Sequence, residues 1–251
     1  DYKKYFLQMK FGFLSTLDNS FLPYFINSAV SEGIKNISII IDPKLSSEKD
    51  IKIFKMRTNG YFGEYSRINN LLFTLNKQSI PFYFVDKHTS ESAKILYEKL
   101  ELDCLINAGT PRKITKSILD VVKNGVINIH PGILPFYRGC SCVEWAIHND
   151  DPIGNTAHFM DQNYDSGPII DVEKYEFASN SNYVDIRNKV YSEGIKLASR
   201  VLKKLENKEI SFKNATPQDE SKSKLWEPIP GYLEKKSIQK ANNHNYKYQI
   251  N

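Results

Sequence analysis

Three polar side chains, contributed by two segments of the chain, could together move an acyl group between amines. Asn128 and His130 lie two residues apart directly after the apolar pair at 126–127, and side chains two apart on a strand project to the same face. Asp165 follows further along in the turn sequence Tyr-Asp-Ser-Gly. An amide can donate to a developing oxyanion, an imidazole can take a proton, and a carboxylate can orient the imidazole. We therefore predict Asn128, His130 and Asp165 as the catalytic residues.

Each of these residues has an ordinary structural alternative when it is considered alone. Asn128 could cap a turn, His130 could be a core histidine with its hydrogen bonds satisfied, and Asp165 could cap a helix. The catalytic interpretation rests on the whole set in its order and spacing.

The three residues belong to a longer pattern. Residues 128–139 read NIHPGILPFYRG, and Trp-Ala-Ile at 145–147, Thr-Ala-His at 156–158 and Asp-Ser-Gly at 165–167 follow. This pattern resembles the formyltransferases that use N10-formyltetrahydrofolate, most strongly over residues 103–170. The resemblance implies a Rossmann-like α/β fold with a mostly parallel central sheet and helices on both faces. It also implies N10-formyltetrahydrofolate as the formyl donor and co-substrate.

The resemblance further implies how the three residues share the work. Asn128 and His130 would stabilise the oxygen that gains charge when an amine attacks the formyl carbon. His130 is also the natural base for the amine proton, because its reference pKa lies near ~6.5. Asp165 would hold the imidazole or relay the proton through water. Whether His130 acts mainly as the base or as the oxyanion stabiliser is left open by the sequence.

Folate contacts are expected from two loops. In similar enzymes, the loop that here reads Gly-Thr-Pro-Arg helps to wall the pteridine site, largely through backbone groups. The loop that leads into Asp-Ser-Gly would contribute as well. The predicted folate-binding residues are Gly109, Thr110, Pro111, Arg112, Asp161 and Tyr164.

Substrate contacts are predicted at Tyr137, Arg138 and Tyr61. Arg138 could clamp a phosphate, since a guanidinium binds phosphate in a bidentate way; its alternative is a structural ion pair. Tyr61, with Tyr65 nearby, could stack on a nucleotide base, and the alternative is ordinary packing in a chain that has 15 tyrosines.

Length and composition exclude several classes. The chain has 251 residues, 41% of them hydrophobic, which is enough for a full core. No apolar run approaches the ~20 residues that cross a bilayer, and no secretory signal pattern opens the chain. Three cysteines, an odd number, argue for a reducing compartment. We therefore predict a cytoplasmic protein without membrane contact. Cys140 and Cys142 lack the partners of a metal site, so no metal is predicted.

The net charge of +5 suits an anionic partner. Much of the lysine lies in the tail, and the surplus is too modest for a nucleic-acid-binding surface. We predict a nucleotide-linked substrate and no nucleic-acid partner.

Strand-like and helix-like segments alternate, which indicates an α/β domain. We predict a catalytic domain at 9–206 and a short extension of strands and loops at 207–251. The expected strands are 10–14, 36–42, 80–85, 103–108 and 125–129, with 155–160 and 168–177 as a further pair. The expected helices are 21–31, 46–56, 66–78, 89–100, 141–148 and 182–205.

Short βα units favour parallel strands with right-handed crossovers. Ligands of such sheets bind at the carboxyl ends of the strands. The segments 109–113, 128–138 and 161–167 each follow a predicted strand end, so they should converge.

Several formyl enzymes compete as the specific assignment. Methionyl-tRNA formyltransferase needs a larger carboxy-terminal domain, formyltetrahydrofolate hydrolase carries a preceding domain, and glycinamide ribonucleotide formyltransferase has a Gly-Ser-Gly loop where residues 14–19 read LSTLDN. The resemblance fits best a short sugar N-formyltransferase of O-antigen and lipopolysaccharide synthesis. Such an enzyme would act on a nucleotide-linked dideoxyamino sugar such as dTDP-4-amino-4,6-dideoxyglucose, and we expect a homodimer. A folate- or nucleotide-binding module without turnover stays open as a different class.

Overall fold

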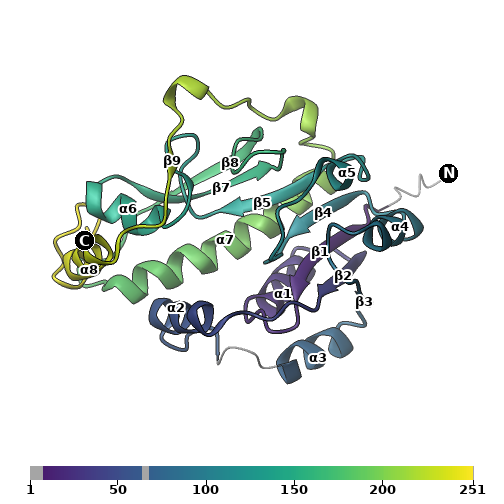
Figure 1. Cartoon of the computed structure of the whole chain (residues 1–251), viewed down its shortest axis with the longest axis horizontal. Helices are drawn as coiled ribbons and strands as arrows, with labels where there is room; N and C mark the ends of the chain where they lie inside the picture. Colours follow the sequence, from purple (N-terminus) through teal and green to yellow (C-terminus); the bar gives the residue numbers. More distant parts are fainter. Residues whose placement is uncertain (1–7, 64–67, 251) are drawn as a thin grey trace.

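A seven-stranded sheet with the strand order β3-β2-β1-β4-β5-β7-β8 forms the centre of the protein (Figure 1). The computed structural model describes residues 8–63 and 68–250. Neighbouring strands from β3 to β5 are parallel, whereas β7 is antiparallel to both of its neighbours. The mostly parallel sheet predicted from the sequence is confirmed. The strands are β1 (Phe11–Thr16), β2 (Ile37–Asp42), β3 (Phe82–Phe84), β4 (Cys104–Asn107), β5 (Val126–His130), β7 (Ile153–Phe159) and β8 (Ile169–Tyr175).

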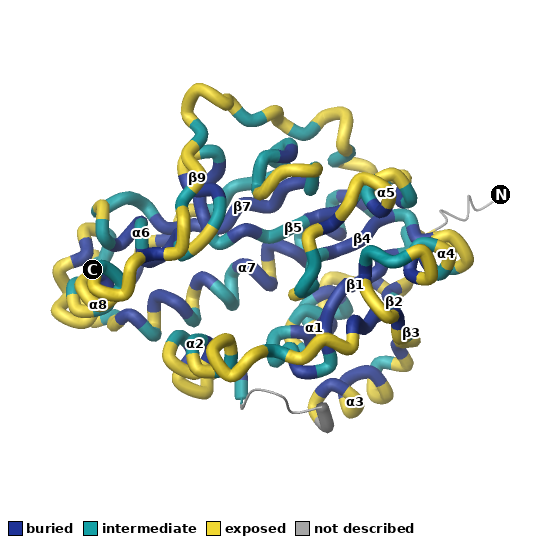
Figure 2. Tube along the Cα trace, viewed as in Figure 1, coloured by how far each residue is buried: buried dark blue, intermediate teal, exposed yellow. Residues whose placement is uncertain are grey.

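Helices cover both faces of the sheet, and this explains why the central strands are apolar without alternation. One core includes side chains of α1 (Leu22–Ser31), α3 (Ile68–Lys77) and α7 (Tyr183–Glu206). The opposite core includes side chains of α4 (Glu91–Lys99) and α5 (Lys116–Leu119). Consecutive strand residues therefore enter different cores, as Phe13 and Leu14 do. Figure 2 shows the resulting burial, which is complete along β1 and β7 and interrupted toward the carboxyl ends of β4 and β5.

The long helix α7 lies beneath the part of the sheet that carries the polar residues of the sequence pattern, and it contacts β5, β7 and β8. Its start is fixed by a capping box in which the Asn182 side chain accepts from the Asp185 N–H and the Asp185 carboxylate accepts from the Asn182 N–H. Such a box satisfies backbone donors that the first helical turn leaves free. α2 (Glu48–Thr58) packs against α7 as well.

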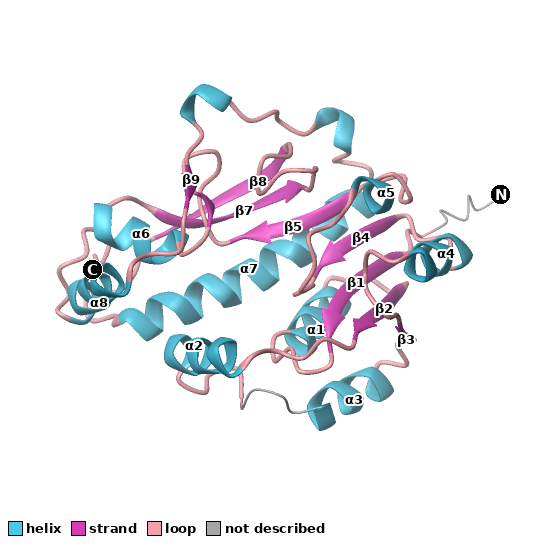
Figure 3. Cartoon of the chain, viewed as in Figure 1, coloured by secondary structure: helices cyan, strands magenta, loops and turns pink. Residues whose placement is uncertain are grey.

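The prediction for the carboxy-terminal extension needs a correction. Instead of strands and loops alone, it contains the helix α8 (Gly231–Asn242), which packs against α6 (Cys142–Asn149). α8 begins directly after Pro230 and buries only Ser237 and Ala241. Its apolar pattern is therefore too weak to predict a helix from the sequence. Figure 3 shows the loop-rich path that precedes it. The extension also holds the short 3-10 helices η1 (Phe212–Asn214) and η2 (Glu220–Lys222) and the strand β9 (Leu225–Trp226), which pairs with β6 (Arg138–Gly139).

The other predicted elements exist with bounds shifted by at most two residues, and the strands β7 and β8, which were expected to pair, do so in antiparallel fashion. Residues 66–67, the predicted start of α3, and Tyr65 lie outside the described residues. Within the described part of the chain, no helix is both long and apolar enough to cross a membrane.

Candidate active site

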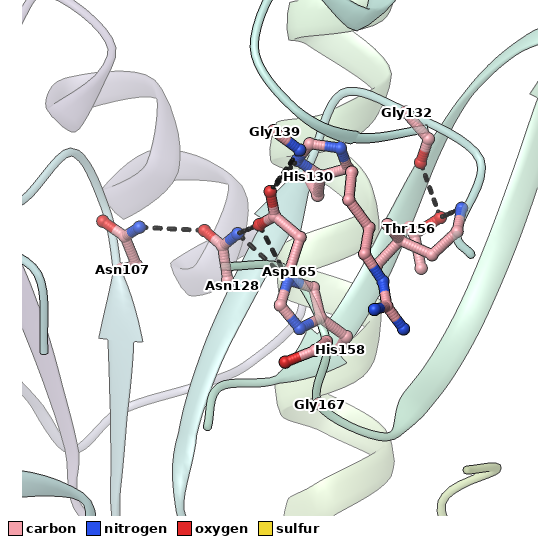
Figure 4. A network of polar contacts seen from close by, with 12 residues as sticks. Asn107, Asn128, His130, Gly132, Gly139, Thr156, His158, Asp165 and Gly167 are labelled. Atoms are coloured by element: carbon pink, nitrogen blue, oxygen red, sulfur yellow. Dashed lines mark hydrogen bonds and ion pairs between the residues drawn. The ribbon is translucent and has the colours of Figure 1, made fainter. Parts of the chain in front are cut away.

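The catalytic residues predicted from the sequence meet at the carboxyl ends of β4 and β5 (Figure 4). The antiparallel register of β7 places His158 opposite Asn128 and Thr156 opposite His130. The loop between β7 and β8 returns Asp165 over the same edge, where it contacts Asn128 and His130.

Asp165 is the centre of this cluster. Its Oδ2 lies 3.4 Å from His130 Nδ1 and accepts a hydrogen bond of 2.9 Å from the Gly139 N–H. Its Oδ1 lies 3.4 Å from Asn128 Nδ2 and 3.6 Å from His158 Nε2. One carboxylate thus lies within 3.6 Å of both predicted partners and of a second histidine.

The partners of the two histidines indicate where their protons lie. His130 Nε2 is 2.6 Å from the Tyr137 carbonyl oxygen, which can only accept, so Nε2 carries the proton in the neutral ring. Its Nδ1 lone pair then faces Asp165. His158 donates from Nδ1 to the Phe159 carbonyl at 2.9 Å, and its Nε2 accepts from Asn128 Nδ2 at 3.1 Å.

Asn128 is oriented from both ends of its amide. Its Oδ1 accepts from Asn107 Nδ2 at 2.8 Å, and one of its hydrogens is directed to His158. The remaining contact with Asp165 is long at 3.4 Å, so this second hydrogen is the one that an incoming oxygen can take over.

Burial and charge set the protonation states. Burial opposes the ionisation of Asp165, but the interactions with His130 and His158 and the Gly139 N–H outweigh it and lower the pKa of Asp165 to about 2. Burial lowers the pKa of His130 below its ordinary value, although Asp165 acts in the opposite direction. At neutral pH, Asp165 is therefore an anion and His130 a neutral base.

Two glycines let the loops fold this tightly. A side chain at Gly132 would put a Cβ 2.6 Å from the Tyr137 carbonyl oxygen and 2.7 Å from His130 Nε2. A Cβ at Gly167 would approach the Phe159 carbonyl oxygen to 1.9 Å. Thr156 ties the first loop to β7, since its hydroxyl donates to the Gly132 carbonyl at 2.7 Å and accepts from the Leu134 N–H at 3.1 Å.

The predicted folate loop follows β4 directly. The Asn107 side-chain oxygen accepts the backbone N–H groups of Gly109 and Thr110 at 3.1 and 2.9 Å. The Arg112 guanidinium is engaged by Asp42 through hydrogen bonds of 2.7 and 2.9 Å, and its backbone N–H donates to the Thr110 hydroxyl at 3.3 Å. Pro111 lines a neighbouring depression of the surface.

The second predicted folate loop is held by Asp161, whose carboxylate accepts the Ser166 hydroxyl at 2.6 Å and the Asn163 N–H at 2.9 Å. Tyr164 is exposed, and the Lys113 ammonium lies 4.8 Å from its ring centre. Tyr164 is therefore largely open to solvent, with Lys113 over one face of its ring.

The predicted substrate contacts lie differently from expectation. Arg138 is nearly buried and donates to both carboxylate oxygens of Glu220 and to Gln218, so its geometry favours the structural ion pair over a phosphate clamp. The Tyr137 ring is buried and stacked on Trp226, and only its carbonyl reaches the site.

Tyr61 is exposed and packs edge-on against Phe62. It is not among the described residues that line the pocket beside Asn128.

That pocket has a volume of about 240 Å³. Its described lining carries apolar and neutral polar side chains and no formally charged one. The lining residues are Phe21, Phe25, Asn107, Gly109, Thr110, Asn128, Ile129, Pro131, Asn155, Val190, Tyr191, Gly194 and Ile195.

The sequence interpretation missed His158 and Asn107 as members of the site. His158 stands in the Thr-Ala-His pattern, but its side chain meets Asn128 only through the β5–β7 register, which the sequence does not give. Asn107, the last residue of β4, could have been found by the rule that strand ends carry site residues. Among the described residues, no group of histidine, cysteine, aspartate and glutamate side chains is arranged to hold a metal ion, and all three cysteines are free.

Known proteins share both sequence and fold with this chain. The methionyl-tRNA formyltransferase of Clostridium tetani is 33% identical over 106 residues, which is 42% of this chain and 34% of that protein. The chain therefore spans about a third of that relative's length. Glycinamide ribonucleotide transformylase 1 from Symbiobacterium toebii superposes with a TM-score of 0.62 at 17% identity, covering 84% of this chain and 93% of that one.

A second solved structure is an N-formyltransferase from Helicobacter canadensis in complex with folinic acid and dTDP-3-aminofucose. Its TM-score is 0.60 at 16% identity, with 87% of this chain and 70% of that one covered. At such identities the two superpositions show a common fold. The sequence model of the family described as Formyl transferase matches residues 48–202, which is more than half of the chain, and the protein therefore belongs to the formyl transferase family.

Proposed function

We propose that this protein transfers a formyl group from N10-formyltetrahydrofolate to the amine of a nucleotide-linked dideoxyamino sugar, with dTDP-4-amino-4,6-dideoxyglucose as the first candidate. The observation that carries the proposal is the Asp165 cluster at the edge of an uncharged pocket. Asn128 belongs to both, because its amide contacts Asp165 and also lines the pocket.

The side chains divide the chemistry as follows. Formyltetrahydrofolate would supply the formyl carbon, and Gly109, Thr110, Asp161 and Tyr164 would hold it. Asn128 donates its second amide hydrogen to the formyl oxygen as that oxygen gains charge, a contribution of ~3 kcal/mol for a well-placed donor.

His130 takes the proton of the attacking amine at Nδ1. The resulting imidazolium then lies between two acceptors, the Tyr137 carbonyl and Asp165. Because Asp165 is already ionised, it stabilises this cation without moving a proton itself. The new nitrogen–carbon bond forms first and moves the carbonyl electron pair to the formyl oxygen. The pair then returns as the bond from the formyl carbon to N10 breaks, and the proton held by His130 passes to the leaving nitrogen.

The loop after β1 argues against glycinamide ribonucleotide as the acceptor. In place of glycines, this loop carries the buried Asp18, whose carboxylate accepts the Ser46 N–H at 2.7 Å and the Thr16 hydroxyl at 2.8 Å. A carboxylate there repels a phosphate group. Methionyl-tRNA remains the second candidate because of the identity with the Clostridium tetani enzyme.

The proposal also keeps the sequence-based expectations of a cytoplasmic homodimer that acts in O-antigen and lipopolysaccharide synthesis. The solved Helicobacter canadensis neighbour supports the proposed donor and acceptor classes, since that protein was crystallised with folinic acid and a dTDP-linked aminosugar. Size-exclusion chromatography with light scattering tests the dimer.

The test of substrate class is a competition among acceptors. The protein is incubated with formyltetrahydrofolate and a panel of nucleotide-linked aminosugars, glycinamide ribonucleotide and methionyl-tRNA, and products are read by mass spectrometry. We expect an aminosugar nucleotide to gain the mass of one CO. Formylation of methionyl-tRNA or glycinamide ribonucleotide instead would overturn the sugar assignment, and folate binding with no formyl transfer would indicate a binding module.

A further inference from the structure

A buried cluster of charged residues connects α2, α6 and α7 behind the pocket. Glu144 is fully buried, and its Oε1 lies 3.4 Å from Arg57 Nη2 and 3.6 Å from Arg187 Nη1. The Tyr183 hydroxyl donates to the same oxygen at 2.6 Å. The two arginines leave the cluster with a net positive charge.

This cluster is a poor device for stability alone. Glu144 Oε2, Arg57 Nε and Arg187 Nε are buried and have no hydrogen-bond partner in the described part of the chain. Buried ion pairs recover their desolvation cost only when their remaining donors and acceptors are satisfied. A further role for at least one of these residues would account for the arrangement.

Arg187 connects the cluster to the pocket through Tyr191. Its Nη2 donates to the Tyr191 hydroxyl, and its guanidinium carbon lies 4.5 Å from the centre of the Tyr191 ring. Burial works against the charge on Arg187, yet Tyr191 and Glu144 keep its pKa raised. Arg187 is therefore a permanent donor that fixes the tyrosine oxygen.

Tyr191 is half-buried and lines the pocket beside Asn128. The Phe21 ring packs against the Tyr191 ring, with a centroid distance of 4.7 Å. An arginine can only donate, so the contact with Arg187 leaves the tyrosine's own proton uncommitted. Within residues 8–63 and 68–250, no acceptor takes this proton.

The charge and the volume of the pocket indicate which part of a ligand would contact Tyr191. Its described lining has no formal charge, so it does not compensate a phosphate. Its volume of about 240 Å³ is below the roughly 300–1,000 Å³ typical of pockets that bury whole drug-sized ligands. A single neutral ring with one apolar face suits a lining of Phe21, Phe25 and the Asn128 amide. Gly109 and Thr110, the proposed folate contacts, also line this pocket, so donor and acceptor would meet at it.

We propose that Tyr191, oriented by Arg187, donates a hydrogen bond to an oxygen of the neutral sugar ring of the acceptor and thereby holds the sugar in this pocket beside Asn128. This inference rests on the proposed function and refines it. The charged part of the acceptor lies outside this pocket, and Tyr191 contributes to the choice of sugar.

The test is Tyr191→Phe, which keeps the ring against Phe21 and removes only the hydroxyl. Binding of the nucleotide-linked aminosugar is measured by isothermal titration calorimetry, alongside steady-state kinetics. We expect Kd and KM for the sugar nucleotide to rise about five- to tenfold, the loss of one hydrogen bond. kcat and the Kd for folinic acid should stay within about twofold. Tyr24→Phe is the matched control, because Tyr24, like Tyr191, packs edge-on against the Phe62 ring but lines a different pocket.

A double-mutant cycle tests the part played by Arg187. Arg187→Met should weaken sugar-nucleotide binding, and adding it to Tyr191→Phe should weaken binding no further than about twofold, because both changes remove one hydrogen bond. If Arg187→Met fails to fold, Tyr191→Phe and its control decide the matter alone.

The outcomes separate this inference from the proposed function. Wild-type protein that binds the aminosugar nucleotide without formylating it would sink the proposed function, while a weaker Kd in Tyr191→Phe would still support the role of Tyr191. An unchanged Kd in Tyr191→Phe overturns the inference even if turnover is efficient. Wild-type protein that binds no aminosugar nucleotide contradicts both.

Discussion

Asp165 combines a low pKa of about 2 with contacts to His130, Asn128 and His158. Its partnership with Asn128 and His130 could be predicted from residue types and order alone. The tautomers could not, because the partners that fix them are the carbonyl oxygens of Tyr137 and Phe159. Backbone groups of this kind leave no trace in residue identity.

Replacement of His130 by Asn removes the titratable base and keeps a polar side chain of similar size. We expect turnover to fall by about 10²–10⁴, the usual scale for a general base, with an unchanged thermal midpoint as the control for folding. Turnover within threefold of wild type would exclude His130 from the mechanism.

The pH dependence follows from the same residue. His130 acts as a base only when neutral, and burial lowers its pKa, so kcat/KM should stay level on lowering the pH through about 6.5 and fall only below it. Asp165 stays ionised over this range because its pKa is about 2. The profile is recorded with wild type and His130→Asn; an acid limb with its midpoint above 6.5, or one retained in the variant, would contradict the assignment.

At the scale of elements, the site depends on the loop after β5, which folds back against His130 at the end of that strand. The sequence predicted most strands and helices because their apolar runs and breakers are local. It could not predict the pairing of β6 with β9 or the β5–β7 register, since these join segments far apart in the chain. For the same reason, Arg138 could not be assigned to Glu220 in advance.

Gly132→Ala tests the tightness of that loop. The added Cβ would meet the Tyr137 carbonyl and the His130 ring, so we expect a loss of about 1–3 kcal/mol in stability and a drop in kcat larger than any change in folate binding. Gly231→Ala is the matched control, because nothing lies within 4 Å of its Cβ and it should keep full activity. Equal kinetics in the two variants would show that the loop tolerates displacement.

At the scale of the whole molecule, the extension behaves as part of the catalytic unit. Gln218 donates to the carbonyls of Asp165 and Gly167 at 2.8 and 2.7 Å, and Trp226 stacks on Tyr137. Ala241 and Tyr246 complete a core with α6 and α7. The domain boundary predicted at residue 206 remains a prediction. These contacts argue that residues 207–251 fold together with the catalytic domain.

Deletion of residues 207–251 tests this dependence. The deletion would expose Phe177, Tyr183 and other side chains of that core, so we expect a markedly lower thermal midpoint and weaker folate binding, measured by circular dichroism and titration. The full chain should unfold in a single transition. A truncated protein with unchanged stability and folate affinity would establish the extension as an independent appendage.

The most direct test of the central claim is the single-turnover rate of formyl transfer in Asp165→Asn at saturating formyltetrahydrofolate and acceptor. The change keeps shape but removes the charge that stabilises protonated His130. The account predicts a rate lower by about 10²–10⁴, with Kd values for folinic acid and acceptor within a few-fold of wild type. A rate within threefold of wild type, or a loss confined to binding, would contradict it.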